Sequence, residues 1–411
     1  MKNIFFTLIF IVYKCSIFSS NIKLGVDVFF EKELYKEYKD KKIGLITNHT
    51  GVDKNLKRTI DKFLEHKNIF SIKAIFSPEH GLFGNCQAGK EIKNSKYKNI
   101  IVYSLHGKNK RPSAEMLKDI DLLIYDIQDI GSRSYTYTST LFFCMEEAAK
   151  KNIKVIVLDR PNPLGDIIDG PMLEKKYRSF LGYINIPYCH GMTIGELSKF
   201  FNEEYKIGCK LKVITMEGWN RKMHFNDTGL LWIPPSPHMP EADSVFYYPS
   251  TGILGELKIV NIGVGYTLPF KIVGAPWIDA DLFSEKLNKQ NLPGVLFIPF
   301  HFRPFYGLYK KEECHGIKIM ITDKTKYNPI SVQYMILGMV KSLYPKIFLK
   351  KINFYKERKN IFCKVNGTDK IYNILIQEPF PAWSIIKLQK EQNKNFFNIR
   401  KKYLFEEYSK K

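Results

Sequence analysis

The sequence predicts an α/β fold, with a doubly wound parallel sheet in the N-terminal domain and a smaller α+β domain after it. Between residues 41 and 160, short apolar runs alternate with polar, glycine-containing loops and stretches of helical spacing, a rhythm typical of a parallel sheet. From residue 248 onward the pattern changes to β-rich segments with scattered helices. A length of 411 residues suffices for two or three domains, each with its own core.

The predicted elements follow one another in a regular order. Five β-rich runs are each too short for a helix and are expected to form strands, at residues 43–47, 72–76, 100–103, 122–125 and 155–158. Helices are expected between them, at residues 55–66, 113–118 and 139–151. Thr193 and Glu196 form a capping box, which predicts a helix over residues 194–205. The proline-rich segment 233–240 is too stiff for a helix and is expected to form a fixed wall of the site.

The first twenty residues have the pattern of an export signal. Lys2 supplies a positive charge, residues 4–12 form an apolar run, and residues 16–20 include three serines. An apolar run of nine residues is about half of the roughly 20 needed to cross a bilayer, so no membrane span is expected. We therefore expect an exported protein, periplasmic or extracellular. Its expected parts are a signal peptide (1–20), a doubly wound domain (21–247) and an α+β domain (248–411).

The chain has a formal net charge of +22, yet its composition does not indicate a nucleic-acid partner. Only nine of its 63 basic residues are arginine, whereas nucleic-acid readers depend on arginine forks, and no nucleic-acid-binding motif occurs. The glycine-rich stretch 263–267 lacks the third glycine of a dinucleotide site, so no cofactor is expected. The cysteines have no metal-site or disulfide-framework spacing, and Cys144, in an apolar stretch, is expected to be a buried thiol.

Chemically active residue types gather in the loops that follow the predicted strands. Because the carboxyl ends of parallel strands border one crevice, these loops are expected to converge on a single site. The loop residues are Asn48, Glu79, His80, Asp126, Asp129, Arg133, Asp159 and Arg160. His190 stands at the entrance of the helix predicted over residues 194–205 and is expected to face the same crevice.

Glu79 is the expected general acid. It follows a strand and Pro78, which disfavours a helical conformation just before it and keeps the carboxylate at the strand end. Partial burial there is expected to raise its pKa from about 4.3 toward 6, a range suited to proton donation at neutral pH. Glycosidic bond cleavage requires a second group, for which Asp126, Asp129 and His80 are the candidates. A helix-capping or ion-paired role is the alternative for Glu79.

Arg133 and Arg160 stand out in a lysine-rich chain, because a planar guanidinium binds a carboxylate through two hydrogen bonds. They suggest an anionic group on the substrate, with an internal pair to a nearby aspartate as the alternative. Asp159 is a further candidate for fixing an arginine or sugar hydroxyls. Tyr135 offers a stacking face and a hydroxyl, with packing on the sheet as its alternative.

Five long motifs occur in order along the chain, followed by two shorter ones. They are TNHTGVD (47–53), FSPEHG (76–81), YDIQDIGSR (125–133), LDRPNPLG (158–165), HGMTIGEL (190–197), PSPHMP (235–240) and GAPW (274–277). These motifs resemble those of the exo-β-N-acetylmuramidase family NamZ, formerly the DUF1343 group. The resemblance extends from about residue 24 to the C-terminus.

The resemblance implies a bacterial enzyme that removes terminal N-acetylmuramic acid from the non-reducing end of peptidoglycan fragments. It also implies a Rossmann-like N-terminal domain, a smaller C-terminal domain and an active-site cleft between them. The glutamate of the family's Ser-Pro-Glu-His-Gly motif maps onto Glu79, and the lactyl carboxylate of muramic acid would give Arg133 or Arg160 a partner. The chain departs from the family pattern in one region, where many members carry Glu-Gly-Thr and then Gly-Arg-Gly-Thr. Here Glu256 is followed by Leu257 and Lys258, and the later stretch has Val264 in place of the arginine and Tyr266 in place of the threonine.

We therefore expect a muramidase-type glycoside hydrolase that acts on muramyl glycans. The expected substrate contacts are Asn48, Arg133, Tyr135, Asp159, Arg160 and His190. One alternative is a secreted protein that binds muramyl or other anionic glycans without cleaving them. Another is metal-assisted hydrolysis by His80, His106 and His190, although their spacing matches no known metal motif and no metal is expected.

Overall fold

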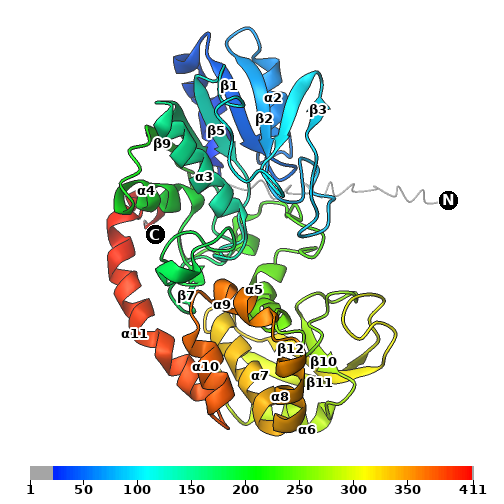
Figure 1. Cartoon of the computed structure of the whole chain (residues 1–411). Coiled ribbons are helices and arrows are strands. Elements are labelled where there is room, and N and C mark those ends of the chain that lie inside the picture. The colour runs from blue at the N-terminus through cyan, green and yellow to red at the C-terminus, as the bar shows by residue number, and fades with distance from the viewer. Residues whose placement is uncertain (1–21, 410–411) are drawn as a thin grey trace, which may run out of the picture.

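The computed structural model describes residues 22–409 and has two domains (Figure 1). A seven-stranded sheet forms the centre of the N-terminal domain, and a three-stranded antiparallel sheet with helices forms the C-terminal domain. This arrangement confirms the expected α/β fold class. The predicted export signal, residues 1–20, lies outside the described residues. Within residues 22–409, no helix combines the length and the apolar character needed to cross a membrane.

The strands of the large sheet lie in the order β3-β4-β2-β1-β5-β6-β9, and all neighbours are parallel except β3 and β4. Their bounds are β1 Lys42–Thr47, β2 Ser71–Ser77, β3 Ser95–Tyr97, β4 Ile100–Ser104, β5 Leu122–Asp126, β6 Lys154–Leu158 and β9 Leu211–Ile214. The order runs outward from β1 in both directions, so the sheet is doubly wound as predicted. The loops after β1, β2 and β5 therefore meet at the point where the strand order reverses.

Most predicted elements of this domain are present. The five predicted strands are β1, β2, β4, β5 and β6, and two of the predicted helices are α2 (Thr59–Glu65) and α3 (Tyr137–Lys150). The capping box is formed as predicted: Thr193 Oγ1 accepts a hydrogen bond from Glu196 N–H, and the Glu196 carboxylate accepts one from Thr193 N–H at 3.0 Å. It begins α4 (Ile194–Glu204).

The helix predicted at residues 113–118 is absent, because residues 114–119 form successive turns. Leu117 N–H donates to the carbonyl four residues back at 3.2 Å, whereas Lys118 N–H donates to the carbonyl three residues back at 3.2 Å. Six residues are too few to offset the cost of nucleating a helix. The segment is nevertheless anchored, since Leu117 is buried in the core.

Helices cover both faces of the large sheet. One face packs against α1 (Gly25–Glu31) and α2, and its core includes Phe29 and Phe63. The other face packs against α3 and α4, and its core includes Leu141 and Leu197. Buried residues of the C-terminal domain continue this second core without a break.

The C-terminal domain contains more helix than the sequence analysis expected. Its sheet, in the order β10-β12-β11, consists of β10 Ile272–Ala275, β11 Val295–Phe302 and β12 Cys314–Ile321. The helices are α5 Ser244–Gly255, α6 Ala280–Asn288, α7 Pro329–Leu343, α8 Pro345–Phe354, α9 Arg358–Asn366, α10 Lys370–Gln377 and α11 Ala382–Arg400. Helix α5, which contains the boundary expected at residue 248, leads into this domain.

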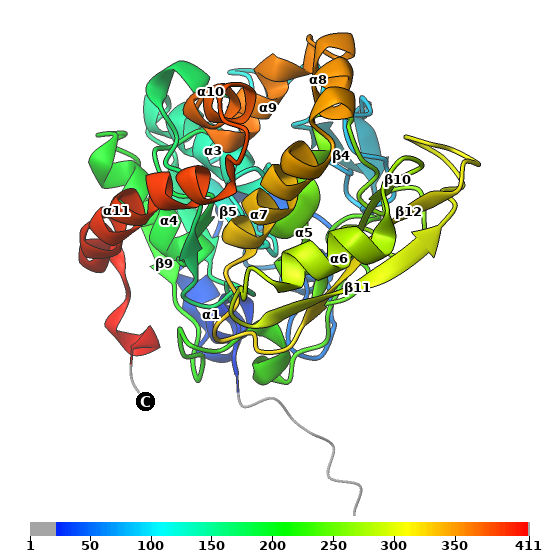
Figure 2. The ribbon, with the colours of Figure 1, turned by 90° about the horizontal axis from the view of Figure 1, so that it is seen from below.

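The C-terminal end of the chain returns to the N-terminal domain. Helix α11 packs against α7 and then runs along the side of the molecule to α4 (Figures 1 and 2). Arg400 at its end donates to the main-chain carbonyls of His190 (3.3 Å) and Gly191 (2.5 Å). Farther on, Tyr408 is fully buried in the core of the N-terminal domain. The two domains are therefore joined by the last helix as well as by α5.

Candidate active site

A cleft of about 560 Å³ lies between the two domains. Pockets for small ligands measure about 300 to 1,000 Å³, so this cleft has room for a sugar unit. Its N-terminal wall includes Gln87, Ala88, Ser134, Leu181, Tyr188 and His238. Its C-terminal wall includes Tyr248, Glu256, Lys258, Val264, Tyr306 and Arg358. The interdomain cleft implied by the family resemblance is therefore present, and the proline-rich segment contributes His238 to its wall.

Glu79 lies beside this cleft, in the loop that follows β2. Its Oε1 accepts a hydrogen bond from Gly89 N–H at 2.9 Å, and its Oε2 accepts one from Thr136 Oγ1 at 2.7 Å. Gly89 directly follows the cleft residue Ala88, and Thr136 is the residue before α3. The Glu79 side chain is 13% exposed. Donors from two different loops therefore hold a carboxylate that solvent still reaches.

The structure corrects the expected protonation of Glu79. Burial acts to raise its pKa, but hydrogen bonds from Thr136 and Gly89, together with the imidazoles of His106 and His80, outweigh burial and lower the pKa below its usual value. The expectation of a raised pKa is therefore wrong for the free protein. The sequence indicated a partly buried position but not that Thr136 and Gly89 would donate to this carboxylate. Glu79 is therefore ionised at neutral pH in the free protein.

Two histidines stand next to Glu79. His80 Nδ1 lies 2.7 Å from the Cys86 carbonyl oxygen, and since a carbonyl only accepts, this nitrogen carries the hydrogen and Nε2 keeps a lone pair in the neutral ring. His106 Nε2 lies 3.7 Å from Glu79 Oε1. Burial lowers the pKa of His106, although the Glu79 charge opposes this. Glu79 and His80, both predicted site residues, are thus brought together, and His106 joins them.

Asp129 and His190 form a second, more deeply buried pair. His190 Nε2 lies 3.9 Å from Asp129 Oδ2, too far for a hydrogen bond. Asp129 Oδ2 accepts from Gly131 N–H at 2.8 Å, and its buried Oδ1 has no hydrogen-bond partner of normal geometry. Burial raises the pKa of Asp129 to about 7 against the backbone N–H groups that face it. Burial also lowers the pKa of His190 to about 3, so its imidazole is neutral.

Asp126 and Arg160 form an internal ion pair. Arg160 Nε donates to Asp126 Oδ1 at 2.5 Å, and Nη2 donates to Oδ2 at 2.9 Å. Thr59 Oγ1 also donates to Oδ2, and Arg160 Nη2 donates to the Val52 carbonyl at 2.7 Å. The alternative stated for Arg160, an internal pair with an aspartate, is the one observed. Neither side chain is among those that line the interdomain cleft.

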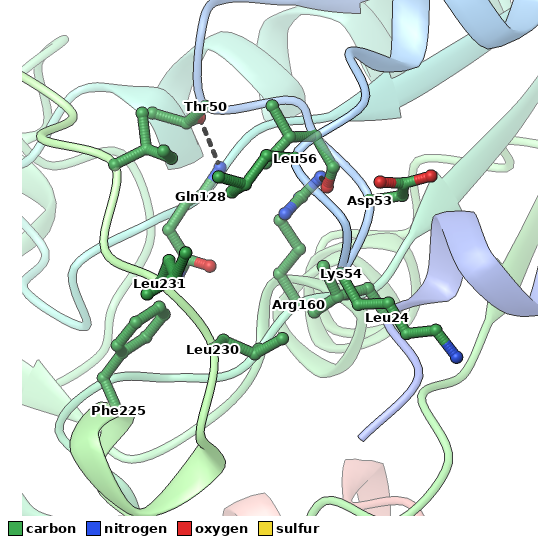
Figure 3. A pocket seen from close by; sticks show the side chains of 12 residues that line it. Leu24, Thr50, Asp53, Lys54, Leu56, Gln128, Arg160, Phe225, Leu230 and Leu231 are labelled. Carbon is green, nitrogen blue, oxygen red and sulfur yellow. Dashed lines mark hydrogen bonds between the residues drawn. The ribbon is translucent and has the colours of Figure 1, made fainter. Parts of the chain in front are cut away.

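Arg160 instead borders a separate small pocket of about 20 Å³ (Figure 3). Thr50 and Gln128 also line this pocket, and Gln128 N–H donates to Thr50 Oγ1 at 3.0 Å. Most of the remaining lining is apolar, with Leu230 and Leu231 on one side. A volume of this size has room for about one water molecule, so a sugar does not fit.

Arg133 donates only to main-chain carbonyls. Its Nη1 donates to Pro171 at 2.7 Å and Ile186 at 2.6 Å, and its Nη2 donates to Val365 at 3.1 Å and Asn366 at 2.7 Å. The side chain is 1% exposed, and burial lowers its pKa to about 10. Because Val365 and Asn366 lie at the end of α9, this guanidinium joins the two domains. Its Nη donors are used inside the protein, and the remaining donor, Nε, is buried without a partner and lies outside the cleft lining. Arg133 is therefore not placed to bind the substrate anion that was expected for it.

Asp159 is also fully engaged inside the protein. Its Oδ1 accepts from Gly195 N–H at 2.8 Å, and its Oδ2 accepts from Thr193 Oγ1 and from Tyr408 OH, both at 2.7 Å. Burial raises its pKa to about 7, and the nearby Glu196 acts in the same direction. Asp159 therefore connects the start of α4 to the C-terminal end of the chain, away from the cleft lining.

Asn48 and Tyr135, both expected to contact the substrate, instead make contacts with neighbouring side chains and main chain. Asn48 Oδ1 accepts from the Thr50 N–H at 2.9 Å and from the Thr50 hydroxyl at 2.6 Å, which shapes the turn after β1. The Tyr135 ring packs edge-on against Tyr137 at 4.8 Å and against the cleft residue Tyr248 at 5.9 Å. Packing, the alternative stated for Tyr135, is what the structure shows.

Several site residues were not singled out by the sequence analysis. Thr136 and Gly89 hold Glu79, and the Ser134 hydroxyl lies 2.5 Å from Tyr188 OH and 3.1 Å from Tyr248 OH. A signal for two of them, Ser134 and Thr136, was present, since eight of the nine residues 132–140 carry a hydroxyl group. Gly89 and Tyr248 come from segments without such a signal.

The histidines and cysteines do not gather around one point. In the part of the chain that the structure describes, no group of three or more His, Cys, Asp or Glu side chains is placed to hold a metal ion. His80 and His106 adjoin Glu79, whereas His190 faces Asp129. The six described cysteines are free thiols, and Cys144 is buried as expected.

Comparisons with known proteins cover both domains. Residues 43–243 match the N-terminal domain of Exo-beta-N-acetylmuramidase NamZ, and residues 246–405 match its C-terminal domain. Peptidoglycan beta-N-acetylmuramidase NamZ of Bacillus subtilis (strain 168) is 40% identical over 391 residues, which are 93% of this chain and 91% of that protein.

Two crystal structures of DUF1343 family proteins from Bacteroides fragilis NCTC 9343 share the fold. One has a TM-score of 0.87 at 41% identity, and the other has a TM-score of 0.71 at 29% identity. Each comparison covers 94% of this chain and 99% of the other. The fold, the cleft and these matches define the class of the protein as a glycoside hydrolase. The chain belongs to the NamZ family of exo-β-N-acetylmuramidases, as its motifs indicated.

The departure from the family pattern falls in the cleft. Val264 lines the cleft wall. Many members of the family carry an arginine at this position. The short, neutral valine removes a cation from this part of the wall.

Proposed function

We propose that this protein is an exo-acting β-N-acetylmuramidase that releases N-acetylmuramic acid from the non-reducing end of peptidoglycan fragments. The observation that carries the proposal is Glu79, a carboxylate held beside the interdomain cleft by Thr136 and Gly89. The name of the Bacillus subtilis relative, a peptidoglycan β-N-acetylmuramidase, supports the substrate class. We also propose that the protein works after export, where cell-wall fragments are found.

In this proposal Glu79 becomes the general acid once the substrate is bound. Burial is already the largest influence on its pKa. A sugar that fills the cleft displaces more water, so binding moves the pKa of Glu79 upward. The protonated carboxyl then donates to the glycosidic oxygen while the sugar ring takes on oxocarbenium character. Glu79 is thus ionised in the free protein and protonated in the complex with substrate.

The second catalytic group that glycosidic bond cleavage requires is proposed to be His80 or Asp129. His80 Nε2 keeps a lone pair next to Glu79, and Asp129 has a carboxyl oxygen without a hydrogen-bond partner of normal geometry. Asp126 does not suit this role, because Arg160 and Thr59 occupy both of its oxygens.

The test is release of nitrophenol from the 4-nitrophenyl β-glycosides of N-acetylmuramic acid and N-acetylglucosamine by the purified protein. We expect release from the muramide alone. Glu79→Gln should lower kcat for a muramyl disaccharide, whose sugar leaving group must be protonated, by about 10²- to 10⁴-fold, the usual contribution of a general acid, while the protein stays folded. Glu217→Gln, at an ion-paired glutamate outside the cleft, is the matched control and should leave kcat unchanged.

Normal turnover by a folded Glu79→Gln protein would disprove the assignment of this residue. Wall fragments labelled at the reducing end test the exo action, since an exo enzyme releases unlabelled monosaccharide first and an internal cut releases longer pieces. Tight binding of muramyl glycans by the wild-type protein with no product would favour the non-catalytic binding protein.

A further inference from the structure

Two cationic side chains and one glutamate line the C-terminal wall of the cleft. Lys258 and Arg358 border the cleft together with Glu256. Arg358 Nε donates to the Glu256 main-chain carbonyl at 2.9 Å, and its Nη2 pairs with the Glu256 carboxylate. These contacts fix the guanidinium at the start of α9 and orient it toward the wall.

Lys258 differs from Arg358 because it forms no hydrogen bond or ion pair with Glu256 and acts on that carboxylate only through the attraction of its charge. In the described part of the chain, Lys258 Nζ makes no ion pair or hydrogen bond, and the residue is exposed. Glu256 is the acidic residue among the cleft-lining side chains, so two cations face one carboxylate and one positive charge is left over. The backbone of Lys258 has a φ of 56°, a conformation that costs a non-glycine residue free energy. The turn after α5 thus places at the cleft a lysine whose charge is in excess of the negative charge on the lining side chains.

The other cationic groups considered for substrate recognition are unsuitable. Arg133 and Arg160 use their guanidinium groups inside the protein, as described above. His238 lines the cleft, but burial and the neighbouring His80 lower its pKa, so it is neutral at pH 7. Lys258 and Arg358 are therefore the permanent cations among the cleft-lining residues.

We propose that Lys258 binds the lactyl carboxylate of the terminal muramic acid residue, and that Arg358 adds a second positive charge on the same wall. The inference rests on the proposed function and adds the side chain that makes the enzyme select N-acetylmuramic acid over N-acetylglucosamine. N-acetylmuramic acid differs from N-acetylglucosamine by this lactyl ether alone, so an enzyme that selects the former needs a site for one carboxylate. A charge-assisted hydrogen bond from Lys258 supplies that site on the wall across the cleft from the N-terminal domain.

The test compares Lys258→Met with two related variants. Lys258→Met should raise KM for the nitrophenyl muramide by about 10- to 100-fold at low salt, the range of one lost charge-assisted hydrogen bond. KM for the same substrate as its neutral lactyl methyl ester should change little. Lys258→Arg keeps the charge and should restore KM for the anionic substrate to within a few-fold of wild type.

Lys206→Met is the matched control. Lys206 is also exposed, also follows a helix with positive φ (50°), and its N–H also donates to the carbonyl three residues back at 3.2 Å, as Lys258 N–H does. It lies outside the cleft lining, so its replacement should leave KM unchanged for both substrates. An unchanged KM for the anionic muramide in Lys258→Met, or an equal rise for the neutral ester, would overturn the proposal.

A binding measurement separates this inference from the proposed function. Calorimetry of free N-acetylmuramic acid with wild-type protein, Lys258→Met and Lys206→Met needs no turnover. Binding lost only in Lys258→Met would support the carboxylate site even if no glycoside were hydrolysed. Equal binding in all three proteins, or binding of N-acetylglucosamine as tight as that of N-acetylmuramic acid, would disprove it even in an active enzyme.

Discussion

Replacing Arg133 by methionine tests whether this arginine holds the domains together or binds substrate. The change leaves four buried main-chain carbonyls without their donor. At about 1 to 3 kcal/mol for each buried group left unsatisfied, with partial relaxation, we expect a loss of about 4 kcal/mol in the free energy of unfolding. The unfolding entropy of a chain of 411 residues is about 0.9 kcal/mol per kelvin, so Tm should fall by about 5 °C.

The assay is thermal unfolding of wild type, Arg133→Met and Arg133→Lys, combined with KM for the anionic muramide and its neutral methyl ester. Lysine keeps the charge but has three donors at one point for four acceptors, so we expect an intermediate Tm. Both variants should change the two KM values by similar factors, since neither removes a contact to the lactyl group. A selective rise in KM for the anionic substrate at unchanged Tm would refute the structural role and restore Arg133 as a substrate contact.

Two further predictions concern buried groups. Because the pKa of Asp129 is about 7 when folded and about 3.9 when unfolded, wild type loses stability as pH rises through this window. Asp129→Asn should therefore unfold at a higher temperature than wild type at pH 8 and show a smaller advantage at pH 4. Asp126→Asn, which breaks an ion pair, should be destabilised at pH 8, and the opposite order of the two variants would contradict this reasoning. Tyr408→Phe removes the hydroxyl that donates to Asp159 and accepts from Met216 N–H, so urea unfolding should show a loss of about 1 to 3 kcal/mol with kcat unchanged. An unaltered urea midpoint would count against that contact.

Five strands and the doubly wound class of the sheet were predictable, because buried parallel strands leave short β-rich runs whose ends must meet at one edge. The same argument placed Glu79 and His80 together beside the site. It failed at residues 113–118, where six residues of helical spacing cannot be distinguished from successive turns. It also overstated the β content of the C-terminal domain, whose amphipathic helices have short apolar stretches that resemble strands.

The partners of the charged loop residues were less predictable, for a physical reason. Asp126 and Arg160 are 34 residues apart, but Asp126 ends β5 and Arg160 lies just after the adjacent strand β6, so the strand order contains a signal for their pairing. Arg133 has acceptors 232 and 233 residues away, in the other domain, and no local pattern indicates such contacts. The pKa of Glu79 was missed for the same reason, since it depends on Thr136, which is 57 residues away.

The buried arginines show why a rare arginine in a lysine-rich chain is a poor sign of substrate binding. Arg133 and Arg400 donate to main-chain carbonyls, and Arg160 and Arg221 each form a two-point pair with an internal carboxylate. Lysine places its donors at one point and cannot satisfy acceptors on several sides, so arginine is required at these positions whatever the composition of the surface. A substrate carboxylate in an open cleft requires a positive charge rather than a planar group with several donors, and a lysine supplies that charge. In this fold the group proposed to recognise an anionic sugar is therefore Lys258, the lysine that lines the cleft in the described structure.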